Sequence, residues 1–174
     1  RLSKLNRNST ETQQKLQELG FKNCAIGGIA VQRWGEPRVT TDVDFTLLCG
    51  FGNERQIVGR ILRHFDPRIE DAEEFAIHAR VLLVEHSRGT PLDISLGALP
   101  FEENVIARAT PWQAPESGSL ITCSAEDLVV LKAFANRTQD LRDIVGVIIR
   151  QGGAAKPISR PGGIDSTGRT QRRT

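Results

Sequence analysis

Apolar residues in this sequence fall into short runs and into helical stripes. The runs have the length of strands, and Gly, Pro or polar residues bound each one, which is typical of strands in a buried sheet. Two of the runs are separated by the turn-forming stretch Ser-Arg-Gly-Thr, so we expect those two to form a hairpin. The pattern predicts strands over residues 21–26, 43–48, 79–85, 91–96 and 120–123.

Apolar residues spaced three and four apart predict helices between these strands. Two of the helices begin with a capping-box pair, Thr10 with Gln13 and Ser124 with Asp127. Residues 112–118 have no such spacing and are expected to form a loop. The predicted helices cover residues 10–19, 29–34, 53–65, 71–77, 100–107, 125–135 and 139–149.

The alternation of strand and helix patterns predicts an α/β (α+β) fold, in which helices flank a small, mixed, twisted sheet and a short helical part follows. We expect residues 1–151 to form this one domain. Residues 152–174 are rich in Gly, Pro and Arg and lack apolar periodicity. They are predicted to form a disordered basic tail.

Composition and charge narrow the class of protein. Hydrophobic residues make up 39% of the 174 residues and charged residues 25%, which is ordinary for a soluble globular protein. The sequence has no apolar run long enough to span a bilayer and no signal-peptide pattern at its start, so we expect a cytoplasmic protein without a membrane partner. The three cysteines are scattered and are expected to be buried in a reducing compartment.

The net charge of +2 hides an asymmetry. The predicted tail holds five Lys or Arg residues against one Asp, so the rest of the chain carries about −2. A domain with that balance gives little reason to expect a general nucleic-acid-binding surface.

The candidate chemistry lies between the first two predicted strands. Asp42 and Asp44 are two residues apart at the start of a strand, so their side chains point to the same face. Two adjacent carboxylates repel each other, and a divalent cation relieves the repulsion. Gly27 and Gly28 stand where the preceding strand turns into a helix, which allows the backbone to approach a phosphate closely. This combination indicates metal-assisted nucleotidyl transfer.

The stretch Gly-Gly-Ile-Ala-Val-Gln-Arg-Trp-Gly-Glu-Pro-Arg-Val-Thr-Thr-Asp-Val-Asp-Phe resembles the signature of the DNA polymerase beta-like nucleotidyltransferase superfamily. It is most similar to the small bacterial branch of AbiEii/AbiGii-type toxins, over roughly residues 21–146. The resemblance implies a third carboxylate on a neighbouring strand, and Asp93, an acid in an otherwise apolar strand, fits that place. It also implies that Asp42, Asp44 and Asp93 are catalytic and bind Mg²⁺ or Mn²⁺. The alternative is that the three acids cap a loop, pair with an arginine and end a strand.

The resemblance extends to residues that would bind the nucleotide. These are Gly27, Gly28, Arg38, Lys132, Arg137 and Asp140. Arg38 has the alternative of a solvated loop residue, and Lys132 that of an ammonium group that reaches the surface. Asp140, like Asp143, has the alternative of capping the last helix or pairing with a nearby arginine.

The resemblance implies transfer of a nucleoside monophosphate from a nucleoside triphosphate to a hydroxyl acceptor. The acceptor would be RNA such as tRNA, in a toxin with an antitoxin partner, or a small molecule such as an antibiotic. The alternative from another class is a non-catalytic nucleotide-binding or regulatory module of the same fold.

Overall fold

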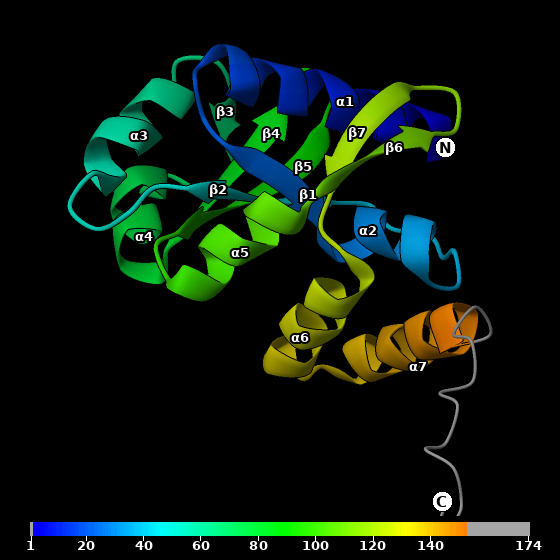
Figure 1. Cartoon of the computed structure of the whole chain (residues 1–174). Helices are drawn as coiled ribbons and strands as arrows, with labels where there is room; N and C mark the ends of the chain where they lie inside the picture. The colour runs from blue at the N-terminus through cyan, green and yellow to red at the C-terminus, as the bar shows by residue number, and fades with distance from the viewer. Residues whose placement is uncertain (1, 153–174) are drawn as a thin grey trace, which may run out of the picture.

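A mixed sheet forms the centre of the computed structural model, which describes residues 2–152; within them the sheet has seven strands in the order β3-β4-β5-β2-β1-β7-β6 (Figure 1). The predicted tail lies outside the described residues except for Gly152. The strands are β1 (Asn23–Ile26), β2 (Val43–Leu48), β3 (Asp66–Pro67), β4 (Val81–His86), β5 (Thr90–Gly97), β6 (Thr110–Ala114) and β7 (Gly118–Thr122). The helices are α1 (Leu2–Glu18), α2 (Gly27–Trp34), α3 (Glu54–Ile61), α4 (Ala72–Ala79), α5 (Pro100–Arg108), α6 (Ala125–Ala135) and α7 (Thr138–Gly152).

Strand β2 lies at the middle of the sheet, where its apolar residues are buried. Val43, Phe45 and Leu47 are fully buried in the main core. β2 pairs antiparallel with β1 and parallel with β5, and the parallel register places Asp44 opposite Asp93. The predicted bounds of β2 are confirmed, as is the hairpin of β4 and β5.

The helices pack into two connected regions. The main core joins the sheet to α1, α3 and α4, and a second cluster joins α2 to α5, α6 and α7. In Figure 1, α6 and α7 form a helical hairpin that lies beside α2, away from the sheet. This arrangement confirms the predicted α/β class and the helical C-terminal part. None of the helices in the described part of the chain combines the length and the apolar character needed to cross a bilayer.

The start of the chain differs from the prediction. Helix α1 begins eight residues before the predicted start at residue 10. The proposed capping pair is wrong, because the Thr10 hydroxyl donates to the Asn6 carbonyl inside the helix and the Gln13 amide bonds with the backbone of Ile121 in β7. The first turns hold polar side chains that are buried and hydrogen-bonded, such as Asn8 to Thr90 at 2.6 Å. A stripe of buried polar residues gives no apolar periodicity from which the sequence could predict the helix.

Residues 112–118 were expected to form a loop, but part of them belongs to strand β6. β6 pairs with β7 at the edge of the sheet and contains Pro111. Proline has no N–H to donate and is tolerated on edge strands, so the sequence of an edge strand can read as a loop. The helix start at Ser124 is confirmed, because its hydroxyl accepts the Asp127 N–H at 3.1 Å.

Candidate active site

Three carboxylates lie close together at the adjacent central strands β2 and β5. Asp42 directly precedes β2, Asp44 lies in β2, and Asp93 lies opposite it in β5. One oxygen from each lies within 4.8 Å of the others, and all three side chains are half-buried. The juxtaposition follows from the i, i+2 spacing and the parallel pairing, and it gives three hard oxygen ligands around one point, as a divalent cation requires. Metal binding itself stays a prediction.

The electrostatics of Asp44 reflect this crowding. Burial, followed by the negative charges of Asp42 and Asp93, raises the pKa of Asp44 from 3.8 to about 6. The Gly28 N–H and the Lys132 ammonium act in the opposite direction. Near neutral pH the three carboxylates of the site therefore repel one another, and a bound cation would relieve this repulsion.

The glycine pair leaves room for the side chains of the acidic site. Gly27 has a φ of +58°, and a Cβ there would lie 1.9 Å from the Asp44 carboxylate. A Cβ at Gly28 would lie 2.6 Å from the hydroxyl of Thr40, which itself donates to Asp42 at 2.9 Å. The glycines are therefore needed to admit Asp44 and Thr40, whereas their contact with a nucleotide stays a prediction.

We expect Gly27→Ala to displace the Asp44 carboxylate and to destabilise the fold, because the new methyl group clashes and φ is left-handed. A matched control is Gly59→Ala in α3, where a Cβ meets nothing within 4 Å. The control should stabilise the protein by roughly 0.5–1 kcal/mol. Urea unfolding of both variants checks this, and equal stability of the two would contradict the role of Gly27.

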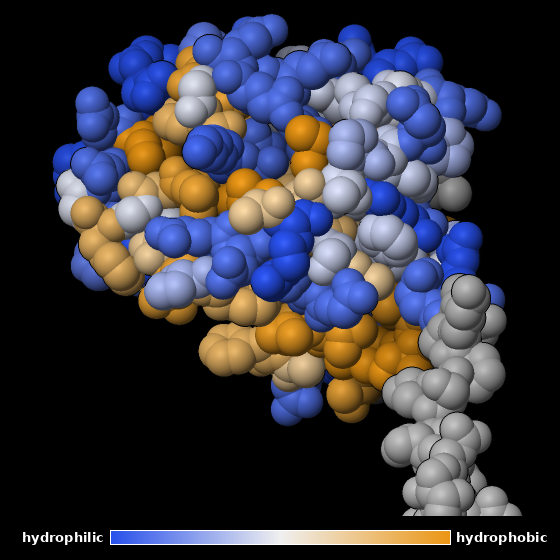
Figure 2. All heavy atoms as spheres, in the orientation of Figure 1, coloured by the Kyte–Doolittle hydropathy of each residue, from blue (hydrophilic) through white to orange (hydrophobic). Residues whose placement is uncertain are grey.

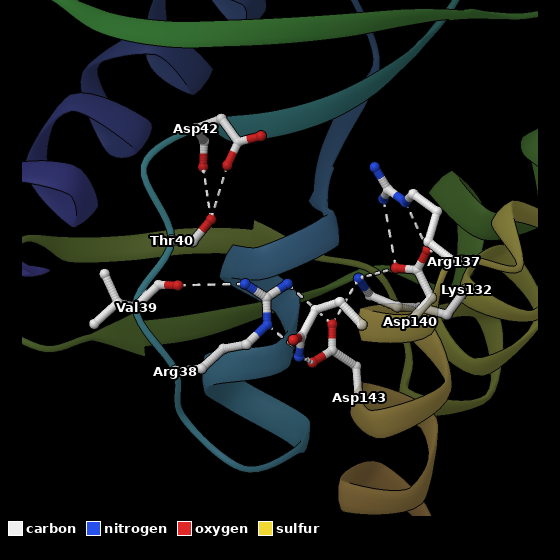
Figure 3. Close-up of polar contacts among 9 residues, drawn as sticks. Arg38, Val39, Thr40, Asp42, Lys132, Arg137, Asp140 and Asp143 are labelled. Atoms are coloured by element: carbon white, nitrogen blue, oxygen red, sulfur yellow. Dashed lines mark hydrogen bonds and ion pairs between the residues drawn. The ribbon is translucent and has the colours of Figure 1, made fainter.

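Arg38 is held by an acid from the last helix. Its Nε and Nη2 donate to the two carboxylate oxygens of Asp143 at 2.9 and 3.0 Å (Figure 3). The pair connects the loop before Asp42 to α7. Arg38 is therefore not the freely solvated loop residue that was the alternative.

Lys132 lies between two acids of α7. Its ammonium is 2.8 Å from both Asp140 and Asp143, and the residue is only 5% exposed (Figure 3). Arg137 adds a second partner to Asp140 at 2.7 Å. The alternative that Lys132 reaches the surface is wrong, because its anionic partners are buried inside the protein.

The carboxylates of this network are stabilised in their charged form. Burial alone would raise the pKa of Asp143, but hydrogen bonds from Arg38, Lys132 and Gln139 outweigh it and lower that pKa to about 2. The pKa of Asp140 is also lowered, because bonds from Arg137 and Lys132 outweigh burial. The alternative that these acids pair with nearby arginines is confirmed for Asp140 with Arg137.

Two adjoining pockets collect the predicted site residues. One, of about 230 Å³, is polar; the other, also about 230 Å³, has an apolar wall formed by α6 residues and Ile26. Asp44, Lys132, Arg137 and Asp140 line both. The polar pocket is also lined by Gly28, Arg38, Asp42 and Asp93, and the apolar-walled pocket by Gly27.

No sequence pattern indicated a role for Arg68. This residue follows the two-residue strand β3, and its Nη1 donates to the Asp93 carboxylate at 2.7 Å. Its backbone N–H bonds to Leu83, the residue of β4 that lies opposite Asp93. Arg68 therefore balances the charge of Asp93 across an intervening strand, a relation that only the strand register reveals.

Comparisons with known proteins connect this geometry to a fold. No protein-family model matches the sequence, and no curated protein matches it either. Among solved structures, the chain resembles the lincosamide antibiotic adenylyltransferase LnuA bound to lincomycin, with a TM-score of 0.54 and 13% identity over 80% of this chain and 94% of that one.

A second solved structure is the antibiotic-resistance factor ANT(2'')-Ia, with a TM-score of 0.53 and 16% identity over 88% of each chain. A third, an antigenic nucleotidyltransferase-like protein from Paracoccidioides brasiliensis, aligns with a TM-score of 0.49 and 18% identity over 85% of this chain and 73% of that one. At these identities the likeness concerns the fold. The chain thus has the fold of the nucleotidyltransferases.

Proposed function

We propose that the protein is a metal-dependent nucleotidyltransferase that moves a nucleoside monophosphate from a nucleoside triphosphate to a hydroxyl acceptor. The observation that carries the proposal is the convergence of Asp42, Asp44 and Asp93 in the lining of a polar pocket. The fold of an adenylyltransferase is in keeping with it.

The donor set fits Mg²⁺ or Mn²⁺. Three carboxylates that share one point repel one another, and the raised pKa of Asp44 reports that repulsion together with burial. Hard oxygen ligands are those that these cations prefer. Asp42, Asp44 and Asp93 would hold the cation, which when bound would neutralise negative charge on the transferring phosphoryl group.

We assign Asp93 as the general base, the carboxylate that accepts the proton of the acceptor hydroxyl. In the transfer, the acceptor hydroxyl loses its proton to Asp93 while its oxygen forms a bond to the α-phosphorus. The bond from the α-phosphorus to the bridging oxygen breaks, and pyrophosphate leaves. Arg68 keeps the Asp93 carboxylate oriented toward the site through its 2.7 Å contact.

Arg137 is the cation best placed to meet the triphosphate. Its side chain is 75% exposed, and the residue lines both pockets. Lys132 and Arg38 are held by buried acids, so we assign them to positioning the α6–α7 hairpin and the loop before Asp42. Gly27 and Gly28, at the start of α2, would present backbone to a phosphate.

For the acceptor we favour a small hydroxylated molecule. The charge of residues 1–151 is near −2, which does not attract a polyanion. The alternative acceptor is RNA such as tRNA, as the resemblance to AbiEii-type toxins implies, with an antitoxin as partner. The observation that favours this alternative is that Lys132, Arg137 and Asp140, the residues of that motif, meet in the pocket.

The direct test is an assay of label transfer. The protein is incubated with Mg²⁺, each α-labelled nucleoside triphosphate in turn, and either total RNA or a panel of small hydroxylated compounds that includes aminoglycosides and lincosamides. We expect the label to move to a small compound. Label on RNA would identify the toxin-type acceptor, and no transfer to any acceptor would favour the non-catalytic module.

Binding is measured separately by thermal melting. A nucleoside triphosphate with Mg²⁺ at 100 times its Kd should stabilise the fold by about 2.7 kcal/mol, a rise of several degrees in Tm. The triphosphate without metal should do much less, because the carboxylates then repel the phosphates. Equal rises with and without Mg²⁺ would contradict a metal site at the three aspartates.

A further inference from the structure

The outward face of the α6–α7 hairpin is apolar. Figure 2 shows an orange area over these two helices. Six large apolar side chains of α6 and α7 are exposed, from 48% for Val130 to 93% for Phe134. We call this set the outer apolar surface; its members are Val130, Phe134, Leu141, Val145, Ile148 and Ile149.

The α6–α7 hairpin buries charged side chains and exposes apolar ones, which is the reverse of an ordinary surface helix. Its inward side carries the buried ion pairs of Lys132, while other inward residues such as Leu128 and Val147 pack in the second core cluster. On α7 the exposed positions 141, 145, 148 and 149 follow helical spacing, so they form one stripe toward solvent. A surface helix normally turns polar residues outward, and contiguous exposed apolar patches usually mark an interaction site.

The size of the outer apolar surface matches what a stable interface needs. Six side chains of this kind, each about half exposed or more, present on the order of 500 Å² of apolar area. A standard interface buries about 800 Å² per partner, of which about 65% is apolar in homodimers. The apolar part of such an interface is therefore on the order of 500 Å² as well.

We propose that the outer apolar surface is the contact between two copies of this chain in a two-fold dimer. In such a contact the same surface meets itself. The six side chains carry no charge, so facing copies bring no like charges together. Glu126 lies one helical turn before Val130, and Arg142 lies three residues before Val145; both are exposed. Glu126 of one copy can therefore meet Arg142 of the other at the rim, which favours a second copy as the occupant.

The mass of the full chain in solution tests the proposal. Sedimentation equilibrium from about 1 to 200 μM should show a species of twice the 19.2 kDa protomer mass. The double variant Val145→Glu/Ile149→Glu should be monomeric, with a dimer Kd at least 100-fold higher. The matched control is Phe51→Glu, which is as exposed at 69% as Ile149 is at 70% but lies in the loop before α3; it should dimerise as wild type does.

Cysteine cross-linking tests the two-fold geometry. Cys24, Cys49 and Cys123 are buried, and burial raises the pKa of each of them, Cys24 to about 12. An Ile148→Cys variant therefore has one accessible thiol, and mild oxidation should convert most of it to a disulfide-linked dimer. Phe51→Cys should give little.

Several results would overturn the proposal. They are a wild-type protomer mass across the whole concentration range, a dimer that survives Val145→Glu/Ile149→Glu, or a mass that rises without limit. A monomer that dimerises only after removal of residues 153–174 would also overturn it, because that segment would then be the occupant. Circular dichroism confirms that each variant is folded, and none of these readouts depends on nucleotidyl transfer.

Discussion

Asp44→Asn should lower the proposed nucleotidyl transfer by at least about 100-fold, because the substitution removes one of the three charges that converge at the proposed cation site. The fold should survive, since the amide has the same shape as the carboxylate. At pH 8 and without a divalent cation, the variant should in fact be more stable than the wild-type protein. An acid that lowers stability is expected at a functional site, because function there requires charges that folding alone does not favour.

The pH dependence of this gain has a definite sign. The pKa of Asp44 is raised to about 6 in the folded protein by burial and by Asp42 and Asp93, against 3.8 for the ordinary group. The stability that Asp44 contributes is therefore fully present below pH 4 and is lost as the pH rises through 6. The difference between these two pKa values corresponds to at most about 3 kcal/mol of unfolding free energy. Asp44→Asn should gain up to this amount at pH 8 and almost nothing at pH 4.

Two measurements on the same preparations test the role of Asp44. Urea unfolding at pH 4 and pH 8 gives the free energy of unfolding, and the label-transfer assay gives turnover per folded molecule. Asp71→Asn, an exposed acid before α4 without a side-chain cap bond, is the control and should change neither. An Asp44→Asn protein that is unstable yet normally active per folded molecule would show that Asp44 is structural.

The parts of the site that the sequence predicts are those that local spacing determines. Asp42 and Asp44 share a face because a strand alternates, and Gly27 begins α2 because the strand must turn there. Asp93 follows from the same logic, since an acid in an apolar strand is costly to bury without a partner. The strand register then brings the third acid to the other two, because β5 pairs with β2 so that Asp93 lies opposite Asp44.

The parts that the sequence does not predict depend on contacts between distant segments. Arg38 and Asp143 are 105 residues apart, and nothing local indicates that they form a bidentate pair. Arg68 reaches Asp93 across β4, and it directly follows β3, a strand too short to give a pattern. Helix α1 was predicted too short for the same reason, because its buried Asn8 is satisfied by Thr90 of β5 rather than by neighbours in sequence.

Lys132→Met should destabilise the fold by about 3–5 kcal/mol, because it removes the one buried cation that two buried carboxylates share and leaves each of them with only an arginine that is more exposed. The Lys132 ammonium lies 2.8 Å from both Asp140 and Asp143, and all three side chains are at most 5% exposed. Methionine fills much of the same volume, so little of the loss should come from a cavity.

The size of this loss should depend on pH. In the wild-type protein the pKa of Asp143 is lowered to about 2 despite burial, and that of Asp140 is lowered too. Their contribution to stability is therefore present above about pH 4 and is lost only as the pH falls toward 2. Without Lys132 the two acids gain stability by taking up protons, so the variant should differ most from wild type at pH 8 and least near pH 4.

Urea unfolding at the two pH values, followed by the fluorescence of Trp34 and Trp112, measures both differences. The double variant Lys132→Met/Asp140→Asn is the matched comparison, because it removes one of the two carboxylates that lose the Lys132 ammonium. It also releases Arg137, whose side chain is 75% exposed and so loses little by becoming unpaired. The double variant should therefore regain at least half of the stability lost at pH 8. A Lys132→Met protein that loses less than about 1 kcal/mol at both pH values would contradict this structural role.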